Sequence, residues 1–329
     1  MNNKHTCRDN SIDAVAGILI INMILRHTIQ RTGMTTLYLY EFTQYFSFII
    51  PWFFFKGGMF FKPCSIKESI AKGWKHLVIP FLKYSLLGHL FICILFYMEG
   101  DMNWIHYLLT PLKEIVLGGA VFGNLPLWFL LSFFVVRVLA NLCFKNLKMV
   151  FIAFISCYAI SNVLFYSGFK EPFWVSNICF GLAFYSLGYI IRQAQYKIPI
   201  VFLAFCIYAY FGISGLTIVD MRSNHLIRGI YAIYPLWALS GIVLMNNIFK
   251  HIRIKPIEHI GKDSMDYYVY HWIVITILSI IFMFFHIPVV GLQSLLIISI
   301  SLCCILPLLN NLPKKIPSYL YTFLKTIHI

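Results

Sequence analysis

The amino-acid sequence predicts an all-α protein: a polytopic integral membrane helix bundle of about ten transmembrane helices, with cytoplasmic N- and C-termini. Of the 329 residues, 60% are hydrophobic and 12% are charged, which is about half the charged fraction of a soluble domain. The apolar residues also form stretches of about 17–25 residues, the length with which a helix crosses a bilayer. The predicted spans are 12–30, 37–61, 78–98, 126–144, 149–168, 173–191, 198–214, 229–248, 266–286 and 289–309.

The segments between these spans leave no room for a soluble domain. The longest gaps that contain polar residues are 99–125, 215–228 and 249–265. We therefore expect one membrane domain over 1–329. The first apolar run is too long for the core of a cleavable signal peptide, so we interpret it as the first span. The cysteines are scattered without a Cys-x-x-Cys pair, and the sequence predicts no metal site.

The basic residues indicate how the bundle is oriented. The formal net charge is +14. With the N-terminus in the cytoplasm, 17 Lys and Arg residues fall in inner segments and five in outer segments. This asymmetry is typical of membrane proteins with positive inner loops, and it explains the surplus without a nucleic-acid partner.

The first span carries three candidate residues, Asp13, Arg26 and His27. Asp13 and His27 are 14 residues apart, which places both on one helix face with about 21 Å of rise between them. Ionisable groups in lipid are costly and tend to face a cavity or a partner. An Arg26 that reaches the head groups beside an interfacial His27 would explain the same pattern equally well.

The next segments add basic residues. Lys56 lies near the inner end of the second span, and Gly57-Gly58 after it would allow a second backbone or a thin ligand to approach closely. In the inner segment 61–80 we expect a short amphipathic helix ahead of Pro80. Its surroundings supply four lysines, which could equally bind acidic lipids: Lys62, Lys67, Lys72 and Lys75.

Later segments supply the remaining candidates. We expect a short interfacial or re-entrant helix in 99–125, ended by Gly118-Gly119. Arg137 lies well inside the fourth span and needs a partner there, which could be purely structural. Tyr267 and His271 are four residues apart at the start of the ninth span, so they share a helix face. An interfacial aromatic belt is the alternative for this pair.

Taken together, these stretches resemble the acyltransferase 3 family of membrane acyltransferases. The resemblance covers roughly residues 8–310. Each motif alone is weak, but five occur in the family's order on a ten-span chain. They are "SIDAVAGILIINMILRH", "PWFFFKGGMFF", "KGWKHLVIP", "LPLWFLLSFFVVR" and "IGKDSMDYYVYHW".

The resemblance implies an enzyme that moves an acyl group, commonly acetyl from acetyl-CoA, to a hydroxyl of a cell-envelope sugar or polysaccharide. A bacterial inner membrane is the natural setting for this family. His27 would deprotonate the acceptor hydroxyl or carry the acyl group transiently. Asp13 and Arg26 complete the predicted catalytic set. The predicted donor-binding residues are Lys56, Lys62, Lys72, Lys75, Arg137, Tyr267 and His271.

One departure from the family pattern concerns Ala16, where members usually carry Arg or Lys eleven residues before the histidine. Arg8, Lys56 or Arg137 could supply that charge instead. Two other functions stay open at this point. One is a transporter or flippase for a glycan or lipid-linked sugar. The other is an inactive acyltransferase-like protein of the cell envelope.

Overall fold

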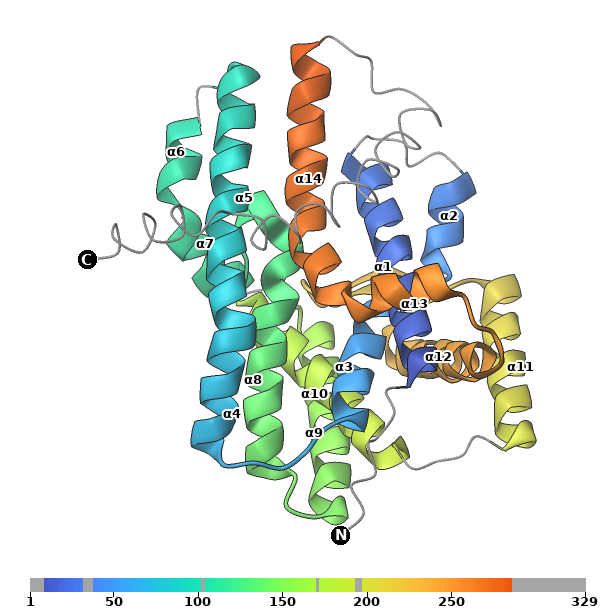
Figure 1. Ribbon diagram of the computed structural model, residues 1–329. Coiled ribbons are helices and arrows are strands. Elements are labelled where there is room, and N and C mark those ends of the chain that lie inside the picture. The colour runs from blue at the N-terminus through green and yellow to red at the C-terminus, as the bar shows by residue number, and fades with distance from the viewer. Residues whose placement is uncertain (1–8, 32–37, 102–103, 170–171, 193–196, 286–329) are drawn as a thin grey trace.

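The computed structural model describes residues 9–31, 38–101, 104–169, 172–192 and 197–285. Seven helices in this part of the chain are long and apolar enough to cross a membrane, and an eighth apolar helix, Ile198–Ser214, is shorter. The chain is therefore an all-α, multi-pass membrane bundle (Figure 1). The predicted tenth span, 289–309, lies outside the described residues, and so does the C-terminus.

The elements of the bundle follow in chain order. They are α1 (Asn10–Arg31), α2 (Tyr38–Gln44), α3 (Ile49–Met59), α4 (Ile66–Gly73), η1 (Trp74–Val78), α5 (Ile79–Met98), α6 (Trp104–Leu109), α7 (Pro111–Gly118), η2 (Phe122–Leu127), α8 (Trp128–Cys143), α9 (Leu147–Tyr166), α10 (Phe173–Ile191), α11 (Ile198–Ser214), β1 (Ile218–Asp220), β2 (His225–Arg228), η3 (Tyr231–Ile233), α12 (Tyr234–His251), α13 (Lys255–Lys262) and α14 (Ser264–Phe284).

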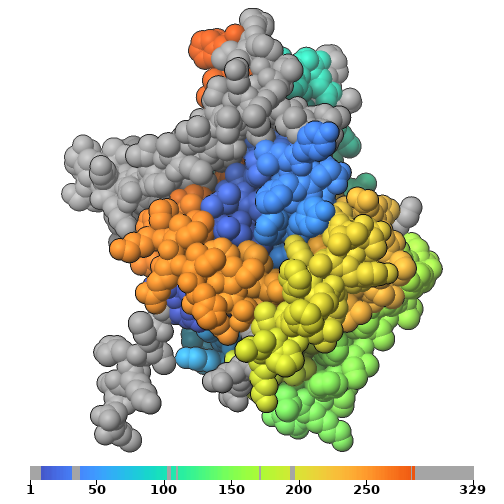
Figure 2. Space-filling model, turned by 90° about the vertical axis from the view of Figure 1, so that its right-hand side faces the viewer, coloured from blue at the N-terminus to red at the C-terminus, as the bar shows by residue number. Residues whose placement is uncertain are grey.

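The segment predicted as one span over 37–61 is two short helices, α2 and α3, joined by a turn. Pro51 explains the start of α3, because it has no N–H with which to bond the Ser47 carbonyl four residues earlier. The Tyr234 hydroxyl donates to that carbonyl at 3.0 Å instead. The Trp237 indole donates to the Ser47 hydroxyl, also at 3.0 Å. This turn lies beside α11, where the Tyr208 hydroxyl donates to the Tyr45 carbonyl at 2.7 Å (Figure 2).

The short amphipathic helix expected ahead of Pro80 is α4, but it does not end before the proline. Helix α4 continues through the π-helical turn η1 into α5, and together they form one rod of 33 residues alongside α8 (Figure 1). Pro80 falls in the first turn of α5, where a helix tolerates a missing N–H. The π-helical turn η1 before it changes the spacing of the backbone hydrogen bonds at this point. The end of α7 agrees with expectation: Gly119 caps it in the left-handed conformation at φ 70°.

Helices α3 and α10 cross at glycines. A Cβ added to Gly58 would collide with the Tyr185 carbonyl oxygen, and one added to Gly188 would collide with the Phe55 carbonyl oxygen. Small residues let two backbones approach closely inside a membrane bundle. The expected close approach at Gly57-Gly58 is thus confirmed, and it fixes α3 beside the core of aromatic side chains.

Two contacts agree with the predicted grouping of inner and outer segments. The Cys64 N–H, two residues after Lys62, donates to the Asn141 side chain near the end of α8 at 3.0 Å. The predicted inner segment 61–80 therefore lies at the same end of the bundle as the C-terminal end of α8. Leu125, from the predicted outer segment 99–125, lines the same cavity as Arg222 from the predicted outer segment 215–228. Which of these ends faces the cytoplasm stays a prediction.

Candidate functional site

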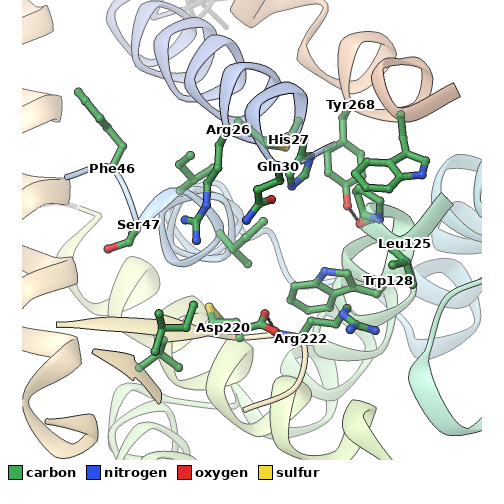
Figure 3. A pocket seen from close by; sticks show the side chains of 18 residues that line it. Arg26, His27, Gln30, Phe46, Ser47, Leu125, Trp128, Asp220, Arg222 and Tyr268 are labelled. Carbon is green, nitrogen blue, oxygen red and sulfur yellow. Dashed lines mark hydrogen bonds between the residues drawn. The ribbon is translucent and has the colours of Figure 1, made fainter. Parts of the chain in front are cut away.

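A cavity of about 300 Å³ lies beside the C-terminal half of α1. Arg26, His27 and Gln30 point into it from α1, and Asp220 and Arg222 form the facing wall (Figure 3). Trp128, Tyr268 and Trp272 close its remaining side, and we call it the histidine cavity. Polar groups from distant parts of the chain therefore converge on one space, as they do in ligand-binding sites.

His27 is held by a second histidine from the other end of the described chain. Its Nδ1 lies 2.9 Å from Nε2 of His271, which is fully buried on α14. The Nδ1 of His271 lies 2.7 Å from the Tyr268 carbonyl oxygen. A carbonyl only accepts, so His271 Nδ1 carries a hydrogen, and in the neutral ring its Nε2 accepts from His27 Nδ1.

This order of hydrogen bonds determines the free atom of His27. With Nδ1 donating to His271, the Nε2 of a neutral His27 keeps an unshared lone pair. Trp272 holds the same ring from the side, edge-on with 5.5 Å between ring centroids. An imidazole fixed in one tautomer by a second group is the arrangement of a positioned general base.

The facing wall comes from the turn between β1 and β2, which pair antiparallel. Asp220 closes this turn, accepting from the Arg222 N–H at 3.0 Å and from the Ser223 hydroxyl at 2.6 Å. Asn224 follows in a left-handed conformation at φ 52°. Both oxygens of Asp220 are thus engaged within the turn, while the Arg222 side chain lines the cavity.

A second, mostly apolar cavity of about 270 Å³ lies behind Tyr268, which lines both spaces. We call it the apolar cavity. Lys56 and Gly57 line it together with rings of Phe129 and Phe133. The Lys56 ammonium lies over the Trp52 ring, 5.3 Å from its centroid, so this lysine packs within the bundle.

A third cavity, of about 510 Å³, follows the apolar cavity and shares Gly57, Phe60 and Phe133 with it. Lys62, Lys72 and Arg137 line this basic cavity. The Lys72 ammonium bonds the Glu68 carboxylate at 2.5 Å. Three neighbouring cavities therefore lie between the basic end of the bundle and the surroundings of His27, with Gly57 lining both the basic and the apolar cavity and Tyr268 lining both the apolar and the histidine cavity.

The structure brings together some of the predicted residues and separates others. His27, Arg26 and, through its hydrogen bond, His271 belong to the histidine cavity. Asp13 is buried near the start of α1 beside Gly261 of α13, and it lines none of these three cavities. The exposed Lys75 and the buried Tyr267 also lie outside all three.

Ala16 is fully buried and lines none of these spaces either. Of the residues considered as substitutes for its missing charge, Arg137 lines the basic cavity and Lys56 the apolar cavity. Arg8 lies outside the described residues.

Sequence reasoning missed three residues that shape the histidine cavity: Tyr268, Trp272 and Arg222. The group of Tyr268 that bonds His271 is its backbone carbonyl, which any residue three positions earlier in the helix would supply, so no signal in the sequence marked this contact. The Tyr268 hydroxyl also donates to the Pro126 carbonyl. Arg222 carried no signal either, because only the fold of the hairpin brings it to α1.

These features define a multi-pass membrane protein in which a half-buried and a buried histidine form a pair at a polar cavity, with further cavities adjoining it. The family model described as an acyltransferase domain matches residues 9–309. The chain therefore belongs to the acyltransferase 3 family and is a membrane acyltransferase in the general sense of that family. No curated protein and no solved structure matches it.

Proposed function

We propose that this protein transfers an acyl group, acetyl in the first instance, from acyl-CoA to a hydroxyl of a cell-envelope saccharide, with His27 as the general base. The observation that carries the proposal is the 2.9 Å contact between His27 Nδ1 and His271 Nε2 at the edge of a polar cavity. It leaves the Nε2 of His27 as a proton acceptor with a fixed orientation.

The proposed reaction has one proton to move. His27 Nε2 takes the hydroxyl proton as the acceptor oxygen attacks the thioester carbonyl. The resulting oxyanion collapses, the carbon–sulfur bond breaks, and the proton passes from His27 to the departing thiolate of CoA. Arg26 lines the same cavity and supplies positive charge where the oxyanion develops. Proton transfer by a positioned base contributes about 10²–10⁴-fold to such reactions.

The donor would enter from the basic end of the bundle. Lys62, Lys72 and Arg137 line the basic cavity, and cations of this kind match the phosphates of CoA. The apolar cavity would then accept the narrow pantetheine arm, whose thioester points toward Tyr268 and His27. This path supports cytoplasmic donor and periplasmic acceptor sides in a bacterial inner membrane, because CoA is a cytoplasmic compound.

The test is acceptor-dependent release of CoA thiol. Protein purified into lipid nanodiscs is supplied with acetyl-CoA, with and without a crude saccharide fraction of the cell envelope, and free thiol is measured over time. The proposal predicts thiol release that the saccharide accelerates and transfer of labelled acetyl to that fraction. A transporter would leave acetyl-CoA intact in this assay, and so would an inactive family member.

A further inference from the structure

A fourth cavity, of about 400 Å³, adjoins the histidine cavity and is lined by helices α6 and α7, η2 and the start of α10. We call it the aromatic cavity, after Tyr107, Phe122 and Phe173 in its lining. Leu125 and Arg222 line both this space and the histidine cavity, so the two spaces meet at these side chains. The proposed reaction uses only one of them.

Positive charge dominates the two adjoining cavities. Arg26 and Arg222 line the histidine cavity, and Lys113 and Arg222 line the aromatic cavity. Among the described residues, none of these three cations lies within 4 Å of a carboxylate. The two acids of the lining are already engaged. Asp220 accepts within its own turn, and Glu114 accepts from the Phe122 N–H at 2.8 Å.

Arg222 is fixed at the junction of the two cavities. Its carbonyl accepts from the fully buried Asn177 side chain at 3.4 Å. Its guanidinium lies over the Phe173 ring, 5.5 Å from the centroid. A guanidinium held in this way and lacking an ion pair in the described chain is suited to a carboxylate or a phosphate.

Lys and Arg are sparse in the segments predicted to be outer, yet two of them, Lys113 and Arg222, line this one cavity. Arg228 in the same hairpin has an acidic neighbour instead, since its guanidinium lies 3.8 Å from the Glu41 carboxylate. Membrane proteins place cations preferentially on the inner side, so a pair of outer cations in one cavity needs another reason. An anionic ligand supplies one.

The aromatic lining indicates a ring-shaped ligand. Tyr107, Phe122 and Phe173 line the cavity, and the Tyr107 and Phe122 rings stack on each other with 5.9 Å between centroids. They form a fixed aromatic wall against which the apolar side of a sugar ring could pack while polar groups bond its edge. We propose that the aromatic cavity binds a saccharide residue that carries a carboxylate or a phosphate, next to the residue that is acylated in the histidine cavity.

This inference rests on the proposed function in one respect: it assumes that the saccharide in the histidine cavity is the acyl acceptor. Its test measures binding and needs no turnover. Protein in nanodiscs is titrated calorimetrically with oligogalacturonate, with its methyl ester, which has the same backbone without charge, and with a phosphodiester-linked glycan. We expect at least one anionic glycan to bind about tenfold more tightly than the neutral ester, and tighter binding of one identifies its anionic group.

Substitutions then show which residues cause the tighter binding of anionic glycan. The double variant Lys113→Gln/Arg222→Gln should bind the anionic glycan and the neutral ester equally. Arg228→Gln, which changes a cation of the same hairpin outside both cavities, should still bind the anionic glycan more tightly. An unchanged unfolding temperature establishes that each variant is folded. Equal affinity for all three glycans, absence of binding by both anionic ones, or a preference that survives the double substitution would overturn the inference. An absence of acetyl transfer with the charge preference intact would contradict only the proposed function.

Discussion

His27 Nδ1 lies 2.9 Å from His271 Nε2, although the two residues are 244 positions apart in the chain. The contact joins α1 to α14 and fixes one imidazole against another. Because the buried His271 is itself held by the Tyr268 carbonyl, the orientation of His27 depends on α14 as much as on its own helix.

Substitution of His271 should act through the position of His27. In His271→Gln the amide oxygen can accept from His27 Nδ1, whereas His271→Leu can neither accept nor donate. We expect kcat to fall about tenfold in the glutamine variant and about a hundredfold or more in the leucine variant, with KM for acyl-CoA little changed in both. Steady-state thiol release checks this. Equal losses in the two variants would contradict a hydrogen-bonding role.

A side chain at Gly57 should obstruct the path from the basic cavity. A Cβ there would lie 2.6 Å from the Phe133 ring and 2.7 Å from the Tyr185 ring, so a ring must move into the shared space. We expect Gly57→Ala to lower kcat/KM for acyl-CoA about tenfold. The matched control is Gly212→Ala, whose Cβ would lie 3.4 Å from Tyr45 and outside these cavities. Equal values of kcat/KM for acyl-CoA in the two variants would show that the donor does not pass Gly57.

Arg137 should contribute to donor affinity, because it lines the basic cavity and a charged hydrogen bond is worth about 1.5–3 kcal/mol. Arg137→Gln is expected to raise KM for acyl-CoA about tenfold or more with kcat unchanged. Lys75→Gln serves as the control, since Lys75 is exposed and lines none of the four cavities. A KM unaffected by the Arg137 change, or equally raised by the control, would place donor phosphates elsewhere.

The hydrogen bond from Tyr234 to the turn between α2 and α3 should contribute to the stability of the protein. Tyr234→Phe removes the donor to the buried Ser47 carbonyl and should lower the free energy of unfolding by about 1–3 kcal/mol. Tyr210→Phe, at a side chain that is 66% exposed, should change it by less than about 0.5 kcal/mol. Thermal unfolding in detergent measures both. A Tyr234→Phe protein as stable as the parent would show that Ser47 has another donor.

The class of fold was predictable from the sequence because composition and apolar length report directly on a membrane environment. The interruption at 45–48 was not, since the apolar run continues through it and the groups that bond the turn, on Tyr208, Tyr234 and Trp237, come from distant helices. At Pro80 the opposite holds, because the short helix expected ahead of the proline continues through it. A helix tolerates proline where a π-helical turn precedes it, and no local signal marks that turn.

The candidate site was predictable in part. His27 and His271 stood out because ionisable groups are rare within spans, yet their contact depends on how α1 and α14 pack. Asp13 shares the helix face of His27 by spacing, but the rise along α1 separates it from the cavity, which it does not line. Arg222 sits in a turn whose sequence carries no motif, so only the folded hairpin reveals it.

The most direct test of the central claim is the rate at which a His27→Gln variant consumes acetyl-CoA, measured beside its affinity for that donor. The account predicts a kcat about a hundredfold or more below that of the unmodified protein, with the dissociation constant for acetyl-CoA unchanged. A variant that turns over acetyl-CoA at the rate of the unmodified protein would show that His27 is not the base.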